Sequence, residues 1–255
     1  MGDYFRCGLR LRFCFGDLKR ETVKRRLVKK MYKVYEIKKR VFEDNDREAD
    51  KMREELREKR TFLLNLMSSP GGGKTTTLKR TINALKDEMR IGVMEADIDS
   101  AVDADAISET GVKVIQLHTG GMCHLDADMT RQGLEEMGTE DVDLAILENV
   151  GNLVCPAEFD TGSVKNVMIL SVPEGDDKPL KYPLMFQVSH CLLINKIDTV
   201  SCFDFDFKAC EERVRRLNPD IKIIPVSAKT GEGMDEWYDW LRKQVQEWNG
   251  SCFKE

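Results

Sequence analysis

The sequence predicts an α/β fold in which a mostly parallel β-sheet carries helices on both of its faces. Short apolar runs typical of buried parallel strands recur along the chain, and helical stretches separate most of them. A glycine-rich turn joins the first of these runs to a helix. The length of 255 residues suits one such domain with short appendages. No run approaches the roughly 20 apolar residues of a membrane helix, so we expect no membrane association.

The first 30 residues differ in charge from the remainder of the chain. Residues 1–30 carry a net charge of +7, whereas the remaining residues carry −12. The simplest interpretation is a solvated basic tail. A nucleic-acid partner is not expected, because this stretch contains no recognisable binding module and the body of the chain is acidic. A further hypothesis is that residues 1–30 are an upstream extension, since Met31 opens a segment typical of a translational start.

The remaining elements follow in chain order, with a helical segment over residues 31–60 and the α/β domain over residues 61–250. The charged stretch from Asp44 to Arg60 has Ala49, Met52 and Leu56 at helical spacing. A helix from Met234 to Trp248 closes the chain. We expect buried strands over residues 61–67, 90–95, 112–117, 144–150, 167–172, 191–195 and 221–226.

The turn after the first strand has the composition of a phosphate-binding loop, which indicates the P-loop NTPase fold. Glycines let the backbone N–H groups approach phosphate oxygens closely, and the residues expected to bind nucleotide here are Gly71, Gly72, Gly73, Lys74, Thr75 and Thr76. Lys74 is expected to contact the β and γ phosphates and to act in catalysis, and the Thr75 hydroxyl to bind Mg²⁺. Ser68 replaces the usual first glycine of the pattern.

Two later segments predict that the nucleotide is GTP. A carboxylate at Asp198 can accept hydrogen bonds from the ring N–H and the exocyclic amine of guanine, and adenine offers no such pair of donors. A serine–alanine–lysine loop after a later strand is typical of support for the same base. The residues expected to bind the base are Asn195, Lys196, Asp198, Ser227, Ala228 and Lys229.

Acidic side chains follow two of the predicted strands and are candidates for the magnesium shell. Asp97 follows one strand and is expected to bind Mg²⁺ or to position the attacking water. Asp99 lies beside it, and Asp103 either shares that role or only flanks a helix. Glu148 ends another strand, where many GTPases have Asp-x-x-Gly, and is expected in the Mg²⁺ shell with Thr75.

Cys123, His124 and Cys155 have the ligand chemistry of Zn²⁺ and Ni²⁺ sites. Their spacing alone does not form a zinc finger, so a buried cysteine and a satisfied histidine remain the favoured interpretation from the residues. All eight cysteines are scattered without a recognisable secretory signal, which indicates reduced thiols in the cytoplasm.

Three segments resemble signature segments of the hydrogenase nickel-incorporation GTPases, the HypB family of the SIMIBI class. The match extends from about Met31 to Trp248. The segments are residues 116–129, 148–157 and 178–183. The resemblance implies that Cys123, His124 and Cys155 bind Ni²⁺ or Zn²⁺ at a subunit interface. It also implies a homodimer that depends on GTP or metal, and partners that include a nickel-accessory protein and the hydrogenase large-subunit precursor.

Other features limit or qualify the resemblance. The chain has neither an N-terminal cysteine-rich nickel motif nor a histidine-rich tract, so tight nickel storage is not expected. Ala96 and Ala101 depart from the family pattern near Asp97. Lys178 either reaches the nucleotide of a partner subunit or is a solvated loop lysine. The alternative functions are a urease-type nickel GTPase and a metal-binding chaperone whose nucleotide is structural.

Overall fold

The computed structural model describes residues 37–97, 104 and 107–250. The expectations for residues 1–30, Met31, Asp99, Ala101 and Asp103 lie outside these residues. Contacts divide the chain into residues 1–40 and residues 41–255. The first unit is described only from residue 37 onward, and the fold below is that of the second unit.

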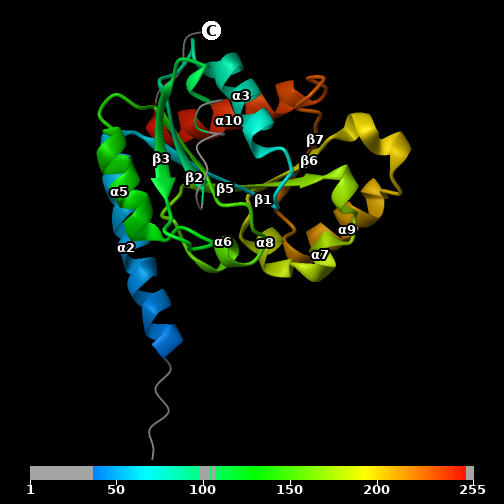
Figure 1. Ribbon diagram of the computed structural model, residues 1–255, viewed down its shortest axis with the longest axis horizontal. Coiled ribbons are helices and arrows are strands. Elements are labelled where there is room, and N and C mark those ends of the chain that lie inside the picture. The colour runs from blue at the N-terminus through cyan, green and yellow to red at the C-terminus, as the bar shows by residue number, and fades with distance from the viewer. Residues whose placement is uncertain (1–36, 98–103, 105–106, 251–255) are drawn as a thin grey trace, which may run out of the picture. The chain divides into compact units, whose positions relative to one another are not determined.

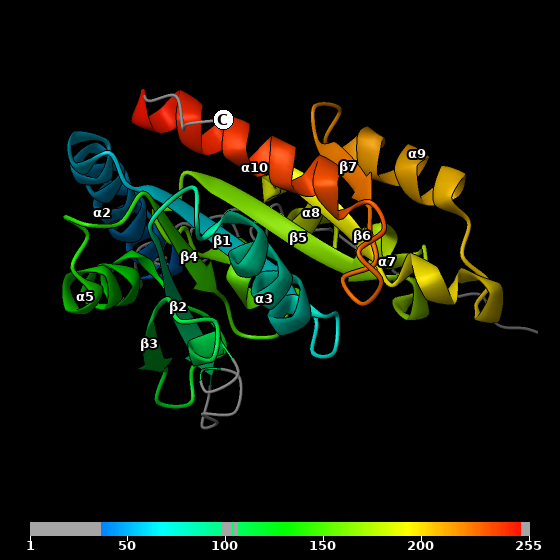
Figure 2. The ribbon, with the colours of Figure 1, turned by 90° about the horizontal axis from the view of Figure 1, so that it is seen from above.

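The centre of the second unit is a seven-stranded sheet in which every pairing is parallel. The strand order is β3-β2-β4-β1-β5-β6-β7, which Figure 2 shows along the sheet. The predicted α/β fold with a parallel sheet is confirmed, and each predicted strand is present with its ends within two residues of the predicted ones. The strands are β1 (Phe62–Ser68), β2 (Ile91–Asp97), β3 (Lys113–His118), β4 (Leu144–Glu148), β5 (Lys165–Ser171), β6 (Cys191–Asn195) and β7 (Lys222–Pro225).

Helices cover both faces of this sheet (Figure 1). The described α-helices are α2 (Ile37–Lys59), α3 (Lys74–Leu85), α5 (Ala127–Met137), α6 (Cys155–Glu158), α7 (Lys178–Lys181), α8 (Pro183–Val188), α9 (Phe207–Leu217) and α10 (Met234–Asn249). The 3₁₀ helices are η1 (Val172–Glu174) and η2 (Ile197–Cys202). Within the described residues, none of the helices is long and apolar enough to cross a membrane.

Successive side chains of each strand point to opposite faces of the sheet, so each face packs against its own layer of helices. In β1, Leu64 packs in one core with Ile82 of α3 and Trp237 of α10. The neighbouring Leu63 packs in a second core with Met52 of α2 and side chains of α5. A third core joins β5 and β6 to α8 and α9. The charged helix predicted before the domain is therefore confirmed as α2, and its sparse apolar side chains contribute to the core.

The direction of the strands places the polar loops. Because all seven strands run the same way, their carboxyl ends meet at one edge of the sheet. At that edge β1 leads into the glycine-rich loop, β4 ends at Glu148 and β6 ends at Asn195. In open parallel sheets this edge is where ligands bind.

Candidate nucleotide and metal sites

The loop between β1 and α3 adopts backbone angles that glycine favours. Gly71 has a φ of 74° and Gly73 a φ of 100°, both in the left-handed region that side chains disfavour. A Cβ atom on Gly73 would also collide with the side-chain nitrogen of Asn195. The loop therefore needs glycine there both for its turn and for its close approach to the end of β6. It opens directly into the N-terminus of α3, where the helix dipole favours anions.

A cavity of about 610 Å³ lies over this loop, a volume typical of sites for small molecules. The glycine-rich loop and the first turn of α3 form one wall, and the ends of β2 and β4 form another. The lining residues are Pro70, Gly71, Gly73, Lys74, Thr75, Thr76, Glu95, Ala96, Glu148, Asn149, Val150, Gly151 and Lys196.

The oxygen donors on the cavity wall suit a hard divalent cation such as Mg²⁺. The Thr75 hydroxyl donates a hydrogen bond of 3.0 Å to Oε1 of Glu148, so two of the predicted Mg²⁺ ligands are adjacent. The carboxylate of Glu95 lines the same cavity and is only 2% exposed. Carboxylate and hydroxyl oxygens are the ligands that Mg²⁺ prefers. This donor set therefore fits the predicted ion.

Glu95 is a candidate magnesium ligand that the sequence pattern did not predict, whereas Asp97 was predicted. Asp97 is the last residue of β2, and its backbone lies opposite His118 of β3. The structure does not describe the Asp97 side chain, so its catalytic and Mg²⁺ roles remain predictions. The signal for Glu95 was available in the sequence, because a carboxylate near the end of an otherwise apolar buried strand needs a polar environment.

Lys74 lies at the start of α3 with its side chain turned back over the loop. Its ammonium donates to the Ser68 hydroxyl at 3.4 Å, and that hydroxyl donates to the carbonyl of Ser69 at 2.7 Å. Ser68, which replaces the usual first glycine, is thus accommodated as a buried polar partner. The serine therefore places a hydroxyl within hydrogen-bonding distance of the lysine.

The two predicted guanine segments meet at the same edge of the sheet. Asn195 is buried, donates to the Gly72 carbonyl at 3.0 Å and accepts from the Ala228 amide at 3.1 Å. The Ser227 hydroxyl donates to Oδ1 of Asp198 at 2.6 Å. Asn195 therefore joins the phosphate loop, the end of β6 and the loop after β7.

Two basic side chains, those of Lys196 and Arg80, also hold these loops together. Lys196 extends along the phosphate loop and donates to the Gly71 carbonyl at 2.7 Å. Arg80 of α3 donates to the carbonyls of Ala228 and Lys229 at 2.7 and 2.9 Å, which fixes their loop against the helix. The structure thus brings the predicted guanine residues together at the carboxyl edge of the sheet, where Lys196 lines the cavity. Their contacts with a base remain predictions.

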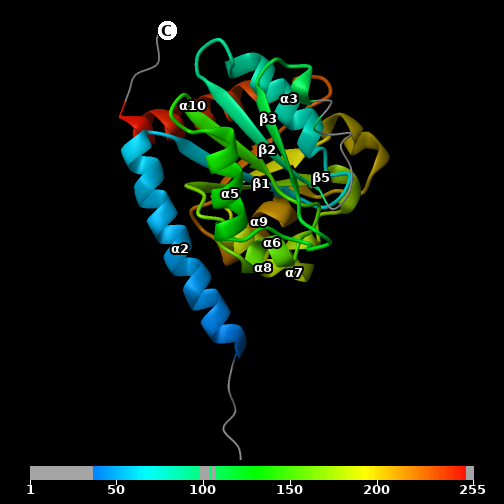
Figure 3. The same ribbon diagram turned by 60° about the vertical axis from the view of Figure 1, so that its left-hand side comes forward.

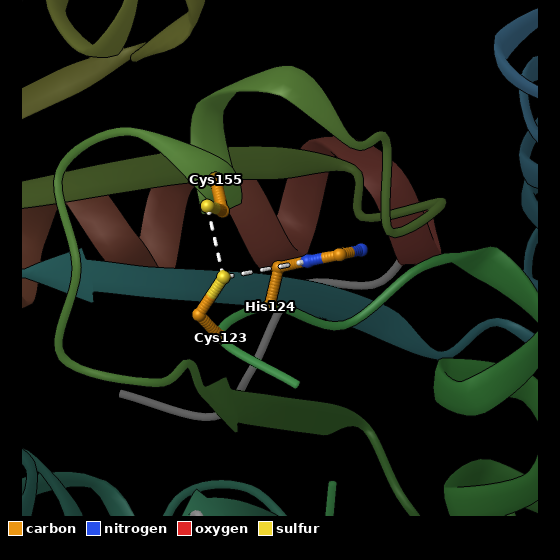
Figure 4. A group of neighbouring side chains, drawn as sticks. All are labelled: Cys123, His124 and Cys155. Atoms are coloured by element: carbon orange, nitrogen blue, oxygen red, sulfur yellow. Dashed lines mark hydrogen bonds between the residues drawn. The ribbon is translucent and has the colours of Figure 1, made fainter. Parts of the chain in front are cut away.

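The predicted metal ligands form a compact cluster (Figure 4). The Sγ atoms of Cys123 and Cys155 are 2.9 Å apart, and Sγ of Cys123 is 4.0 Å from Nδ1 of His124. One ligand atom from each of the three residues lies within 4.8 Å of the others. Cys123 and His124 belong to the loop between β3 and α5, whereas Cys155 begins α6. Residues far apart in sequence meet because both loops leave the carboxyl edge of the sheet.

The chemistry of this cluster differs from that of the magnesium donors. Two sulfur atoms and an imidazole nitrogen suit Zn²⁺ or Ni²⁺. The ring of His124 stacks on Phe159, with centroids 3.8 Å apart. Burial lowers the pKa of His124 below its usual value, so the imidazole is neutral near pH 7 and able to bind metal. The hydrogen bond with Cys123, followed by burial, raises the pKa of the Cys155 thiol.

A short segment connects the cluster with the nucleotide cavity. Glu148 to Gly151 line the cavity, and Cys155 follows four residues after Gly151. Gly151 approaches Pro70 of the phosphate loop so closely that an added Cβ would lie 3.2 Å from the proline ring. Lys178, by contrast, begins α7 with its ammonium 5.6 Å from the centre of the Tyr182 ring. It is not among the residues that line the cavity in the described part of the chain.

Comparisons with known proteins agree on one family. Residues 62–225 match the family model for the CobW/HypB/UreG nucleotide-binding domain. The hydrogenase maturation factor HypB of Azotobacter chroococcum mcd 1 is 47% identical over 212 residues, which cover 83% of this chain and 70% of that protein.

Two solved structures are similar over most of the chain. The crystal structure of HypB from Helicobacter pylori in complex with nickel has a TM-score of 0.75 and 38% sequence identity. The similarity covers 83% of this chain and 100% of that one. HypB from Archaeoglobus fulgidus gives a TM-score of 0.74 and 40% identity, over 79% of this chain and 98% of that chain.

Proposed function

The chain belongs to the HypB family of hydrogenase maturation factors, and on that basis we propose that it is a GTP-hydrolysing metallochaperone that assists nickel insertion. The observation that carries the proposal is the thiol–imidazole cluster, joined by a short segment to a cavity lined by residues that we assign to nucleotide binding. A nickel complex among the similar structures supports the choice of nickel as cargo.

In the nucleotide half of the proposal, the glycine-rich loop holds the phosphates of GTP and Asp198 reads the guanine. Lys74 lies where its charge stabilises the negative charge that develops on the transferred phosphoryl group. Thr75 and Glu148 would hold Mg²⁺, which supplies further neutralisation of that charge. We assign Asp97 to the same ion or to the attacking water, from its place at the end of β2.

In the metal half, Cys123, Cys155 and His124 bind nickel as cargo, and Zn²⁺ is a competitor with the same ligand preferences. Three protein ligands leave coordination positions for a second copy of the cluster or for an acceptor. We therefore assign the cluster to the interface of a GTP-dependent homodimer. The delivery partners are a nickel-accessory protein and the hydrogenase large-subunit precursor, and the reaction takes place in the cytoplasm.

The coupling between the nucleotide site and the metal site follows from thermodynamic linkage. A ligand shifts a conformational equilibrium only by its different affinity for the two states. Loss of the γ-phosphate would remove contacts near Gly151, and the chain from Gly151 to Cys155 is short enough to move the thiol. Nickel affinity is therefore expected to differ between the GTP and GDP states. Lys178 is assigned to the partner subunit's nucleotide in the GTP-bound dimer.

The test is nickel binding to the full chain with a non-hydrolysable GTP analogue and then with GDP. Wild type should bind differently in the two states, and Cys123→Ala should lose most of the binding. Cys202→Ala is the matched control, since Cys202 is an exposed thiol at the end of η2. Equal nickel binding by wild type and Cys123→Ala, or no dependence on nucleotide, would contradict the delivery role.

A further inference from the structure

Asn45 of α2 hydrogen-bonds with both of the segments that carry the thiol–imidazole cluster. Its Nδ2 donates to the backbone carbonyl of Asp160 at 2.9 Å, in the segment that follows Cys155. Its Oδ1 accepts from the backbone N–H of Ala127 at 2.9 Å, in the segment that follows His124. One partly buried amide therefore fixes the distance between two loops that are otherwise distant in sequence.

An aromatic contact repeats this link one helical turn earlier. The ring of Phe42 lies 5.0 Å from the ring of Phe159, and Phe159 stacks on the imidazole of His124. Phe42 and Asn45 are three residues apart, so they lie on the same side of α2. Figure 3 shows α2 beside α5, the helix that follows the loop of Cys123 and His124, and side chains of the two helices share one core. The same helix face thus contacts the backbone near the ligands and the ring beside one of them.

A third contact attaches the segment after Cys155 to α2. Arg53 donates to the Asp160 carboxylate and to the Ser163 carbonyl, the latter at 3.0 Å. Asp160 is therefore attached to α2 through its carbonyl and its carboxylate. The metal ligands lie in segments outside the ladder of the sheet, so their separation depends on such contacts. Groups behind the ligands that fix their orientation typically change metal affinity about 10- to 100-fold when removed.

We propose that α2 is part of the metal site, with Asn45 and Phe42 as positioning residues that hold the two ligand loops at binding distance. This inference rests on the proposed function only in taking Cys123, His124 and Cys155 as metal ligands. It gives α2 a role that its charged sequence does not suggest. The helix sets the geometry of the site without contributing a ligand.

The experiment compares Ni²⁺ affinity and the Co²⁺ absorption spectrum in the full chain. Affinity is measured by competition with a chromogenic chelator, and the visible spectrum reports the geometry of thiolate and imidazole ligands. Asn45→Ala should bind Ni²⁺ about 10-fold more weakly and shift the Co²⁺ bands, with GDP affinity unchanged. Phe42→Leu should shift the Co²⁺ bands in the same direction with a smaller loss of Ni²⁺ affinity, because it retains apolar packing.

The controls separate positioning from stability. Arg47→Ala is on the same helix. In the part of the chain that the structure describes, the Arg47 side chain hydrogen-bonds with Glu43 and Asp44 of that helix, so both readouts should match wild type. If Asn45→Ala does not fold, Phe42→Leu supplies the test. Wild-type Ni²⁺ affinity and Co²⁺ bands in the folded variants, with binding lost in Cys123→Ala, would overturn the positioning role alone. Wild-type binding in Cys123→Ala would overturn the metal site and the proposed function together.

Discussion

The two edges of the parallel sheet are built from different interactions. At the amino edge, Arg90 makes a bidentate ion pair with Asp143, and the Thr61 hydroxyl donates to the carbonyls of Thr139 and Val142. At the carboxyl edge, side chains such as Asn195 instead join loops around a cavity. Contacts at the first edge connect structural elements to one another. Those at the second leave an opening lined with charged and polar groups.

This difference predicts that substitutions at the amino edge affect folding stability and that substitutions at the carboxyl edge affect ligand binding and catalysis. A parallel sheet cannot change its carboxyl edge without changing the loops that bind ligand. Its amino edge can hold the strands together without constraining those loops. Substitutions at the carboxyl edge should therefore change chemistry or binding, whereas a substitution at the amino edge should change stability alone.

The largest expected effect is on GTP hydrolysis in Lys74→Ala. Removal of one group that stabilises transition-state charge typically slows the chemical step about 10²- to 10³-fold. The folded state should be little affected, since the hydrogen bond from Lys74 to Ser68 is long at 3.4 Å. Single-turnover phosphate release measures the rate. The matched control is Lys79→Ala on the same helix, whose ammonium pairs with Glu109 instead. Normal hydrolysis by Lys74→Ala would contradict the phosphate-site assignment, and absent release from wild type would favour a structural nucleotide.

Asp198→Asn should have the next largest effect, on the choice of base. A hydrogen bond to a charged group contributes roughly 1.5–3 kcal/mol, so GDP affinity should fall about 10- to 100-fold. The new amide can donate to the 2-oxo group of xanthine, so affinity for XDP should rise. Fluorescence titration with labelled GDP and XDP measures both constants. Unchanged discrimination between the two nucleotides would mean that Asp198 does not read the base.

Nickel affinity should rise with pH, by about tenfold per pH unit for each thiol that must lose its proton. The pKa of Cys155 is raised, so this thiol is protonated at neutral pH and releases a proton when metal binds. The pKa of His124 is lowered, so its imidazole is already neutral and adds no slope near pH 7. Nickel titrations from pH 6.5 to 8.5 should therefore give a shallower slope in Cys155→Ser than in wild type. Parallel slopes would show that Cys155 is not a ligand.

The sequence predicted the strands and helices along the chain better than it predicted which of them lie side by side in the fold. Buried strands are recognisable because runs such as Leu144–Glu148 are continuously apolar until their last residue. The phosphate and guanine residues follow such strands, so their common edge could be expected from the parallel arrangement alone. The strand order was not predicted, because it depends on long-range packing that no local pattern records.

The metal site was harder to predict for the same reason. The spacing of Cys123 and Cys155 favours no metal site by itself, and only the topology brings their sulfur atoms to 2.9 Å. The contacts of Asn45 join residues 82 and 115 positions apart, and an asparagine in a charged helix gives no local signal of such a role. Glu95 differs, because a charged residue within an apolar strand is a local signal that the sequence itself contains.

The smallest expected effect is the loss of folding stability in Arg90→Ala. This variant also tests most directly whether the two edges of the sheet have separate roles. Hydrogen bonding from Arg90 is the main cause that lowers the pKa of Asp143 in the folded chain. A carboxyl with a lowered pKa stabilises the fold above its unfolded pKa of about 3.9 and loses that contribution as pH falls through the folded value. Because the guanidinium is half exposed, the loss at pH 7 should be about 1 kcal/mol.

Thermal unfolding from pH 3 to pH 7 measures this effect. The Tm of Arg90→Ala should lie about 2–4 °C below wild type at pH 7. The difference should shrink as pH falls below the unfolded pKa of about 3.9 and towards the lowered pKa of Asp143 in the folded chain. GDP and nickel affinities should match wild type at pH 7, since Arg90 lies at the opposite edge from both sites. A constant Tm difference across this range would exclude the ion pair as its source. A loss of nickel or GDP affinity would show that the amino edge also supports the ligand loops.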